Sequence, residues 1–219
     1  DKAKGTIQFA AGLSGFFTDT LSMDAAKAYS LFSDVPVSSW YFDYVMYVYE
    51  KGLMTGTTQS TFNPKGYVTR AMLAQILYNM AGAPKDASSD SETASSVEIL
   101  LPEAKTAWYG AAAAWALKNE IISDYGKGTF GPAEPVTREQ LADILWRYAR
   151  YSDMDMGSGT YPGLGQYADV FAVSEELRDG FDWVCSHGIM QGKGDGTQLM
   201  PQDHATRAEM AAILRRFSE

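Results

Sequence analysis

The chain has 219 residues, of which 46% are hydrophobic and 13% aromatic, so it can fold around a real core. Its net charge of −9 argues against nucleic-acid binding, which needs a basic face, and against polybasic attachment to a membrane. The single cysteine, Cys185, rules out an internal disulfide. No apolar run approaches the roughly 18 residues of a membrane-spanning helix.

The N-terminal segment, residues 1–31, is the least regular part of the sequence. Its residues 22–29 predict a short capped helix that packs on the first repeat. An aromatic run at 40–50 then predicts a helix that is apolar on most faces, with Gly52 placed to end it. A polar, glycine-containing loop leads to a second helix, in which Leu73, Ile76, Leu77 and Met80 have the spacing of one helix face.

The second helix opens with a motif that occurs three times. Its arginines, Arg70, Arg138 and Arg207, lie 68 and 69 residues apart (138 − 70 = 68; 207 − 138 = 69), and a fixed period of this length marks a repeat protein. The threonine before each arginine is a good helix N-cap. Gln140 and Glu209 complete the spacing of a capping box, whereas Met72 breaks it.

An arginine in the first helical turn opposes the helix dipole, so its threefold occurrence needs a reason. The residues alone leave two open: an ion pair with a carboxylate of a neighbouring repeat, or an anionic ligand. The period divides the rest of the chain into repeat 1 at 32–82, a linker at 83–106, repeat 2 at 107–151 with a degenerate start, a linker at 152–166, and repeat 3 at 167–219.

Each repeat is predicted to contain a first helix, a loop and a second helix. Aligned aromatic residues of the first helices, Tyr47, Trp115 and Trp183, predict that these three helices meet near a common axis. A linear solenoid would contradict that prediction.

The ordered motifs resemble the S-layer homology (SLH) family over residues 32–217. They are Phe32-x-Asp34-Val35-Pro36, the aromatic helix, a Gly-Leu/Ile-Met step, a glycine loop, Phe-x-Pro and Thr-Arg-Ala-Glu. The resemblance implies a mainly α fold, in which three helix–loop–helix repeats close into a pseudo-three-fold trefoil around a central three-helix bundle. It also implies a secreted module that anchors a surface protein to the cell wall.

The anchoring ligand that the resemblance implies is a secondary cell-wall polysaccharide, an anionic one bearing pyruvate ketals on an amino sugar, bound in grooves between repeats. Arg70, Arg138 and Arg207 then inherit the anion-binding role, since a guanidinium matches a carboxylate with two hydrogen bonds. Asp34 and Asp169 match the aspartate at the repeat start, which bonds sugar hydroxyls or braces the groove. Trp40 and Trp108 match the family's aromatic position, for which we favour a core role over a sugar platform.

Departures from the family pattern predict unequal grooves. Met72 and Gln140 replace the motif glutamate, and repeat 2 lacks both the starting aspartate and the glycine that ends the first helix, where Glu120 stands. Arg207 is therefore our first choice for the ligand, Arg70 the second and Arg138 the last.

An enzyme is the rival hypothesis, and we expect none. Cys185 and His187 lie two residues apart on a predicted helix and so point to different faces, and His204 precedes the third motif, where a surface role or a sugar contact is expected. We expect no cofactor, metal, nucleic acid or membrane insertion, and a monomeric trefoil. A further alternative is an SLH-like structural or protein-interaction module that has lost sugar binding.

Overall fold

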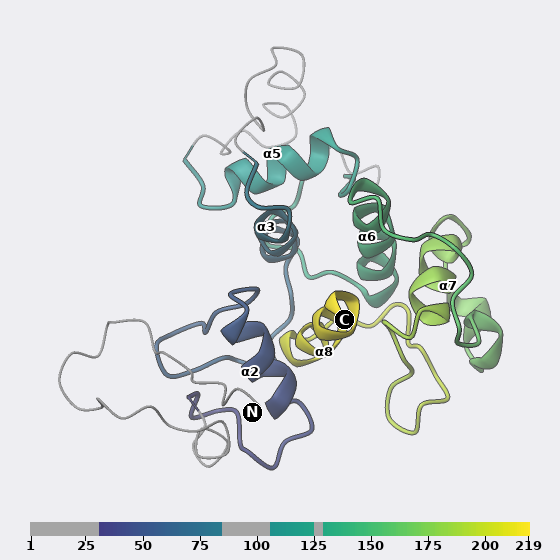
Figure 1. Ribbon diagram of the computed structural model, residues 1–219, viewed down its shortest axis with the longest axis horizontal. Coiled ribbons are helices and arrows are strands. Elements are labelled where there is room, and N and C mark those ends of the chain that lie inside the picture. The colour runs from purple at the N-terminus through teal and green to yellow at the C-terminus, as the bar shows by residue number, and fades with distance from the viewer. Residues whose placement is uncertain (1–30, 85–105, 125–128) are drawn as a thin grey trace, which may run out of the picture.

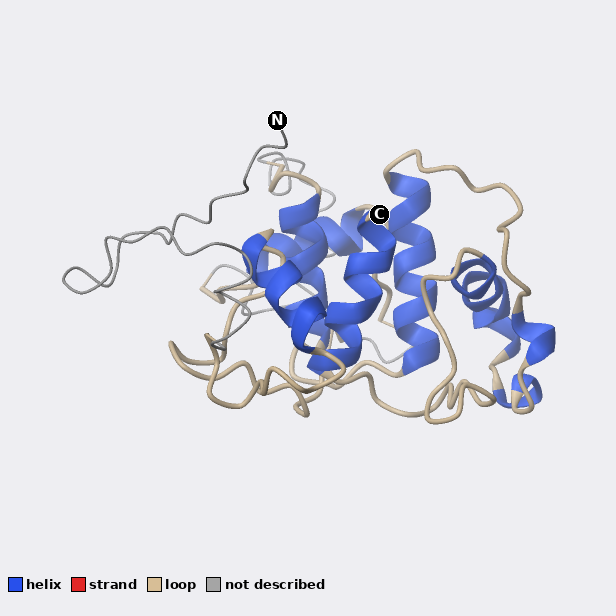
Figure 2. Cartoon of the chain, turned by 60° about the horizontal axis from the view of Figure 1, so that its bottom comes forward, coloured by secondary structure: helices blue, strands red, loops and turns tan. Residues whose placement is uncertain are grey.

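The computed structural model describes residues 31–84, 106–124 and 129–219. The helix predicted at 22–29 and most of the linker at 83–106 lie outside these residues. The described ranges are helical and contain no strand beyond isolated bridges (Figures 1 and 2). Their α-helices are α2 (Phe42–Glu50), α3 (Arg70–Met80), α5 (Gly110–Lys118), α6 (Arg138–Tyr151), α7 (Arg178–Ser186) and α8 (Arg207–Ser218). Three 3₁₀-helices precede α7: η2 (Leu164–Gln166), η3 (Val170–Ala172) and η4 (Glu175–Leu177).

The threonine caps begin the second helix of every repeat, as predicted. Thr69, Thr137 and Thr206 each accept a hydrogen bond from the backbone N–H three residues later. The reciprocal bond from Gln140 or Glu209 completes a capping box in repeats 2 and 3, and Met72 leaves the box of repeat 1 incomplete.

The helices pair between repeats. The second helix of each repeat packs against the first helix of the next, so that α3 lies on α5, α6 on α7, and α8 on α2. Figure 1 shows α3, α6 and α8 inside and the other three helices outside. The last pairing returns repeat 3 to repeat 1.

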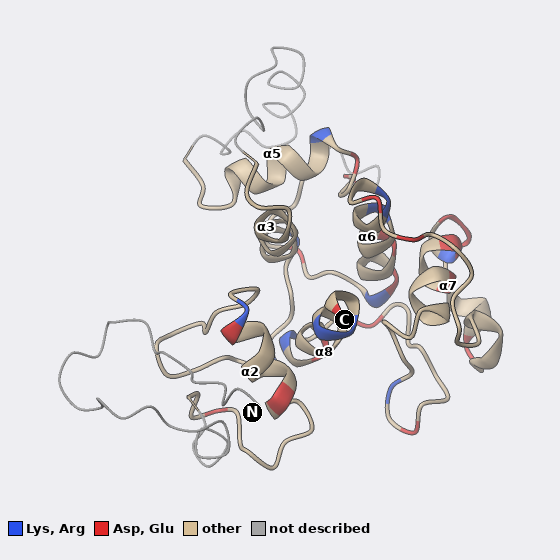
Figure 3. Ribbon diagram, viewed as in Figure 1, with Lys and Arg blue, Asp and Glu red and all other residues tan. Residues whose placement is uncertain are grey.

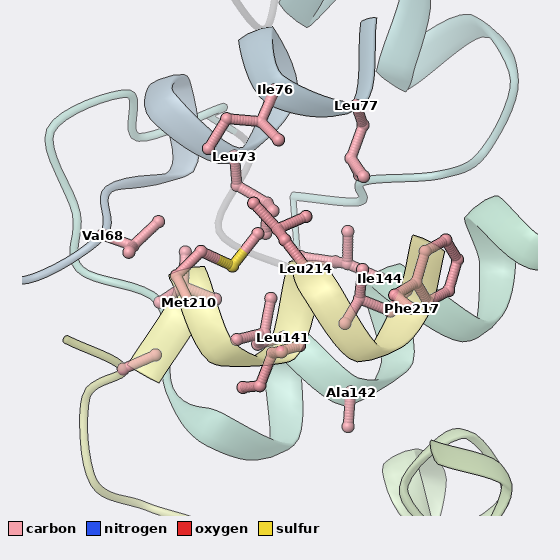
Figure 4. Packing of buried hydrophobic residues seen from close by; sticks show 14 of the residues in the cluster. Val68, Leu73, Ile76, Leu77, Leu141, Ala142, Ile144, Met210, Leu214 and Phe217 are labelled. Carbon is pink, nitrogen blue, oxygen red and sulfur yellow. The ribbon is translucent and has the colours of Figure 1, made fainter. Parts of the chain in front are cut away.

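The centre is therefore built by the second helices, and the prediction that the first helices meet near an axis is wrong. Leu73 and Leu77 of α3, Ile144 of α6 and Leu214 of α8 point toward one another (Figure 4). The second helices carry buried apolar residues on several faces, whereas α2 buries only Phe42, Val45 and Val48. Aromatic residues of the first helices contact second helices instead: Trp115 packs on Tyr78 and Tyr148, and Trp183 on Phe217.

Three backbone hydrogen bonds close the repeats into a ring just before the second helices. The N–H of Val68 donates to Ala205, that of Ala205 to Val136, and that of Val136 to Val68, at 2.9 to 3.0 Å. A linear solenoid is excluded, because its third repeat would not reach its first. The cyclic order is what a trefoil requires, and the trefoil shape itself stays a prediction.

The first helices all end at a residue with left-handed backbone. Gly52 (φ 68°) and Gly188 (φ 70°) occupy this position in repeats 1 and 3, and Glu120 (φ 56°) occupies it in repeat 2. Such a backbone suits glycine, which has no Cβ to clash, so Glu120 adopts a costly conformation. Across the described residues, no helix is long and apolar enough to cross a membrane.

Candidate inter-repeat binding grooves

The motif arginines lie at the contacts between successive repeats. Their side chains are only 2 to 6% exposed. Each guanidinium donates from Nε and Nη2 to two backbone carbonyls of the next repeat, at 2.5 to 2.8 Å. The accepting carbonyls belong to Phe130 and Ser123 for Arg70, to Leu199 and Gln191 for Arg138, and to Phe62 and Thr55 for Arg207.

These carbonyls explain a cation in the first helical turn, because they offset both the dipole and the desolvation of the guanidinium. Burial lowers the pKa of Arg138 and of Arg207, although a guanidinium stays protonated in proteins. At Arg138 a carboxylate also balances the charge, since Nη1 lies 3.9 Å from Oε1 of Glu209. Arg207 has no ion-pair partner within the described residues.

The repeat-start aspartates brace a loop. The carboxylate of Asp34 accepts the backbone N–H groups of Phe62 and Asn63, and that of Asp169 accepts those of Leu199 and Met200, at 2.7 to 2.8 Å. Of the two roles predicted for these aspartates, bracing is the one that the hydrogen bonds show.

The loop that the aspartates brace contains a left-handed residue. Asn63 has φ 58° and Met200 has φ 50°. Repeat 2 lacks the aspartate but has Gly131 (φ 61°) at the same position, where glycine adopts this backbone without strain.

One open groove, the α3 groove, has a volume of about 440 Å³. All three repeats contribute to it: α3 and the preceding loop from repeat 1, a tryptophan from repeat 2, and an arginine from repeat 3. The lining residues are Gly52, Leu53, Met54, Thr55, Gly56, Thr57, Met72, Gln75, Ile76, Asn79, Trp108 and Arg207.

A second groove, the α8 groove, has a volume of about 530 Å³ and the equivalent construction one repeat earlier in the ring. Its walls are α8, the loop before it and the tryptophan of repeat 1. The lining residues are Trp40, Gln191, Gly192, Lys193, Gly194, Glu209, Ala212, Ile213 and Arg216. Both volumes lie within the roughly 300–1,000 Å³ of small-molecule sites.

The tryptophans of both grooves are exposed, and the core role that we favoured for them is wrong. Trp40 is 61% exposed and Trp108 is 66% exposed. Each ring meets the following tyrosine edge-on, Tyr41 at 5.4 Å and Tyr109 at 5.3 Å between centroids. The first helices begin only at Phe42 and Gly110, so both tryptophans precede the helix and face the groove rather than the core.

A charge network in the α8 groove was not predicted. Lys193 Nζ lies 3.3 Å from Oε1 of Glu209 and 3.0 Å from Oδ2 of Asp203. The sequence suggested Glu209 only as a cap, and its capping box holds the other carboxylate oxygen on Thr206. Lysine and glutamate 16 residues apart gave no signal, because the loop geometry brings them together.

The cyclic pairing also separates residues that one motif contains. Arg207 reaches forward into the α3 groove, where Met72 occupies the motif glutamate position, while Glu209 stays in the α8 groove beside Arg138. The ranking of the arginines by the completeness of their own repeats therefore used the wrong neighbours.

The α6–α7 contact is filled differently. Glu176 stands where the other repeats have the tryptophan, and buried Glu139 accepts hydrogen bonds from Ser174 and Gln202. Residues 125–128 of the adjoining loop lie outside the described part. Gly180 lets the two helices approach closely, since a Cβ there would lie 2.9 Å from the Cα of Asp143.

The residues of the enzyme hypothesis each have structural contacts of their own. Cys185 is buried, which raises the pKa of its thiol to about 12 through desolvation. Nδ1 of His187 lies 2.8 Å from the carbonyl of Trp183, and exposed His204 packs against Tyr67.

Charged residues of both signs are interspersed along the ribbon (Figure 3). The described residues contain no cluster of three or more histidine, cysteine or acidic side chains suited to a metal.

Comparison with known proteins gives matches along the whole repeat region. The family model of the S-layer homology domain matches residues 31–72, 103–142 and 166–211. The chain is 29% identical over 183 residues to an endoglucanase of Bacillus sp. (strain KSM-635), and this match covers 84% of this chain and 18% of that protein. It is 27% identical over 192 residues to the S-layer protein sap of Bacillus anthracis, covering 86% and 21%.

A third relative is cell surface glycoprotein 1 of Acetivibrio thermocellus, 26% identical over 184 residues, with 77% of this chain and 7% of that protein covered. The chain thus spans about a fifth or less of the length of these relatives.

Proposed function

Since this chain belongs to the S-layer homology domain family, we propose that it anchors a larger surface protein to the bacterial cell wall by binding a secondary cell-wall polysaccharide in its inter-repeat grooves. The ligand is an anionic, pyruvylated amino sugar. The module acts outside the cell as a monomeric trefoil and catalyses no reaction itself. Its relatives include S-layer proteins and also an endoglucanase, in which the matching part is a small fraction of the protein. One anchoring module attached to different cargo accounts for that range.

The observation that carries the proposal is the repeated construction of the α3 and α8 grooves. In each, an exposed tryptophan from one repeat faces the second helix and glycine-containing loop of another. Exposed indole rings of this kind offer a flat apolar face with a polar edge, which suits the apolar face of a sugar ring. Polar groups on the opposite wall, such as Gln75 and Asn79, can bond hydroxyls.

The test is sedimentation with purified walls, intact or stripped of polysaccharide by hydrofluoric acid. The parent should sediment with intact walls only. The double variant Trp40→Ala/Trp108→Ala should lose binding while keeping its melting temperature, since both rings are mostly exposed. Phe171→Ala is the matched control, because Phe171 is an aromatic residue 89% exposed that lines neither groove.

Equal sedimentation with intact and stripped walls would reject the polysaccharide. It would instead favour the alternative of a structural or protein-interaction module that has lost sugar binding.

A further inference from the structure

The three contacts that close the ring are not linked in the same way along the chain. Residues 83–106 link repeat 1 to repeat 2, and residues 152–166 link repeat 2 to repeat 3. The second linker is also bonded to α7, since the N–H of Tyr161 donates to the carbonyl of Ser186 at 2.9 Å. Repeat 3 meets repeat 1 at a contact that no linker spans, which we call the seam. Opening the seam therefore releases more chain freedom than opening a contact that a linker holds together.

The seam also lacks the charges that hold repeat 2 to repeat 3. In that other contact, Lys193 Nζ lies 3.0 Å from Oδ2 of Asp203 and 3.3 Å from Oε1 of Glu209. The same oxygen of Glu209 lies 3.9 Å from Nη1 of Arg138 in repeat 2. The residues of repeat 1 that align with the three charged residues of repeat 3 are all uncharged: Thr57, Gly66 and Met72.

A buried carboxylate provides a second tie between repeats 2 and 3. Glu139, which is 5% exposed, accepts hydrogen bonds from the backbone N–H and the hydroxyl of Ser174, both at 3.0 Å, and from Nε2 of Gln202 at 2.8 Å. Both partners belong to repeat 3. At the seam the residue after the motif arginine is Ala208, whose methyl group cannot accept a hydrogen bond, so this tie is missing there.

The seam is held instead by the motif guanidinium on its two carbonyls and by cations that stack on tyrosines. The guanidinium of Arg215 lies 5.6 Å from the ring centroid of Tyr44 and 5.4 Å from that of Tyr47, and that of Arg216 lies 5.6 Å from Tyr44. The ion pair of Arg215 is with Glu219 of its own helix. Over the described ranges no ion pair joins repeat 3 to repeat 1. Partly exposed cation–π contacts are weaker than buried hydrogen bonds to a charged group.

Both grooves have walls on either side of the seam. The α8 groove lies between α8 with its loop in repeat 3 and Trp40 of repeat 1. The α3 groove is formed mainly by α3 and its loop in repeat 1, and Arg207 reaches it from repeat 3. A molecule held in either groove therefore contacts both sides of the seam, and its binding favours the closed ring over an open one.

We propose that the ring opens and recloses at the seam while repeats 2 and 3 stay together, and that a molecule bound in either groove holds it closed. Because one opening removes a wall from both grooves, occupancy of one groove raises the affinity of the other. This coupling rests on the proposed function, whereas the opening is a property of the free chain.

Hydrogen exchange of equivalent amides tests the opening without any ligand. Three backbone N–H groups donate across the seam, and three at the aligned positions donate between repeats 2 and 3. The seam donors are Val68, Arg207 and Ala208, and the aligned donors are Ala205, Arg138 and Glu139. After correction for intrinsic exchange rates, the seam amides should exchange about tenfold faster or more, because the missing charged ties contribute at least that factor.

A transfer of charge tests the cause. Thr57→Lys/Met72→Glu places the lysine–glutamate pair of the other contact at the seam, and it should slow the seam amides by about two- to tenfold. Thr57→Lys/Met72→Gln is the matched control, because glutamine completes the capping box, as Gln140 does, without supplying the anion. The control should leave the seam amides unchanged. In both variants the amides between repeats 2 and 3 should exchange as in the parent, and the melting temperature should not fall.

Saccharide released from walls by hydrofluoric acid is the probe for the coupling. At about a hundred times its dissociation constant it should slow the seam amides about a hundredfold, because the seam then opens only after the saccharide leaves. Equal exchange at the seam and between repeats 2 and 3 in the free chain, or an equal effect of the control variant, would overturn the opening. Seam exchange that bound saccharide does not change would overturn the coupling. A saccharide that fails to bind would overturn the proposed function and the coupling with it, while the exchange of the free chain still decides the opening.

Discussion

Replacing Arg207 with alanine removes two charge-assisted hydrogen bonds from the contact between repeats 3 and 1. The carbonyls of Phe62 and Thr55 lose their donor, and the ring of Phe62 loses a guanidinium 4.5 Å from its centroid. Phe62 is fully buried, so water reaches its orphaned carbonyl poorly, whereas Thr55 is exposed and its carbonyl can be hydrated.

The expected loss of stability can be worked out from these contacts. A hydrogen bond to a charged group contributes roughly 1.5–3 kcal/mol, so two contribute about 3–5 kcal/mol when water replaces part of the bond to the exposed Thr55. In a domain of this size 1 kcal/mol corresponds to about 2–4 °C, which predicts a fall in melting temperature of roughly 6–20 °C. The melting temperature of Arg207→Lys should lie between those of the parent and Arg207→Ala, because one ammonium group cannot donate to both carbonyls in the way a guanidinium does.

The assay is thermal and urea denaturation of the Arg70→Ala, Arg138→Ala and Arg207→Ala variants, together with saccharide titration well below each midpoint. All three should lose similar stability because their carbonyl contacts are equivalent. Under the proposed function, Arg207→Ala should also weaken the binding of a pyruvylated amino-sugar glycoside by about ten- to a hundredfold, because Arg207 lines the α3 groove. Unchanged melting in all three would refute the structural role of the arginines, and unchanged glycoside binding by Arg207→Ala would refute its contact with the ligand.

Three further predictions concern stability. Glu120→Gly should raise the free energy of unfolding by about 1 kcal/mol, because glycine adopts the left-handed backbone without strain. Gly52→Ala should lower it by a similar amount, although the added Cβ would meet nothing within 4 Å. Urea denaturation midpoints measure both changes. Asp169→Ala should cost about 2–4 kcal/mol through two lost backbone hydrogen bonds, and calorimetry should show that adding Met200→Gly recovers about 1 kcal/mol of it. Cys185 should react slowly with a thiol reagent at pH 8 without denaturant, because its thiol is buried. Burial raises the pKa of this thiol from about 9 to about 12, so between these pH values only the unfolded chain loses the proton. The free energy of unfolding should therefore fall as the pH rises through that window.

The sequence predicted the features that depend on residues only a few positions apart. The threonine caps, the capping boxes at Gln140 and Glu209 and the incomplete box at Met72 involve side chains three residues apart on one helix, so spacing alone predicts them. The left-handed position of Glu120 follows in the same way from its alignment with Gly52 and Gly188.

Which helices meet could not be read from the sequence, because the period fixes what repeats and not what pairs. The aromatic residues at Tyr47, Trp115 and Trp183 suggested that the first helices form the axis. The helices α6 and α8, with buried alanine and leucine residues on several faces, take the centre instead. The core role predicted for Trp40 and Trp108 was wrong for a related reason. Both residues precede their helices, so the apolar face of a helix does not determine where they lie.

The ring explains why an unfavourable residue stands in every first turn. A second helix packs on the first helix of the following repeat, so its start must be tied to that repeat rather than to its own. Backbone carbonyls of the following loop are available in any sequence, whereas a carboxylate partner would have to be supplied at each contact. A long, planar, always-charged donor satisfies two such carbonyls at once. The neighbouring repeat also supplies what stands beside each guanidinium: Glu209 lies 3.9 Å from Arg138, whereas Met72 lines the groove that Arg207 reaches.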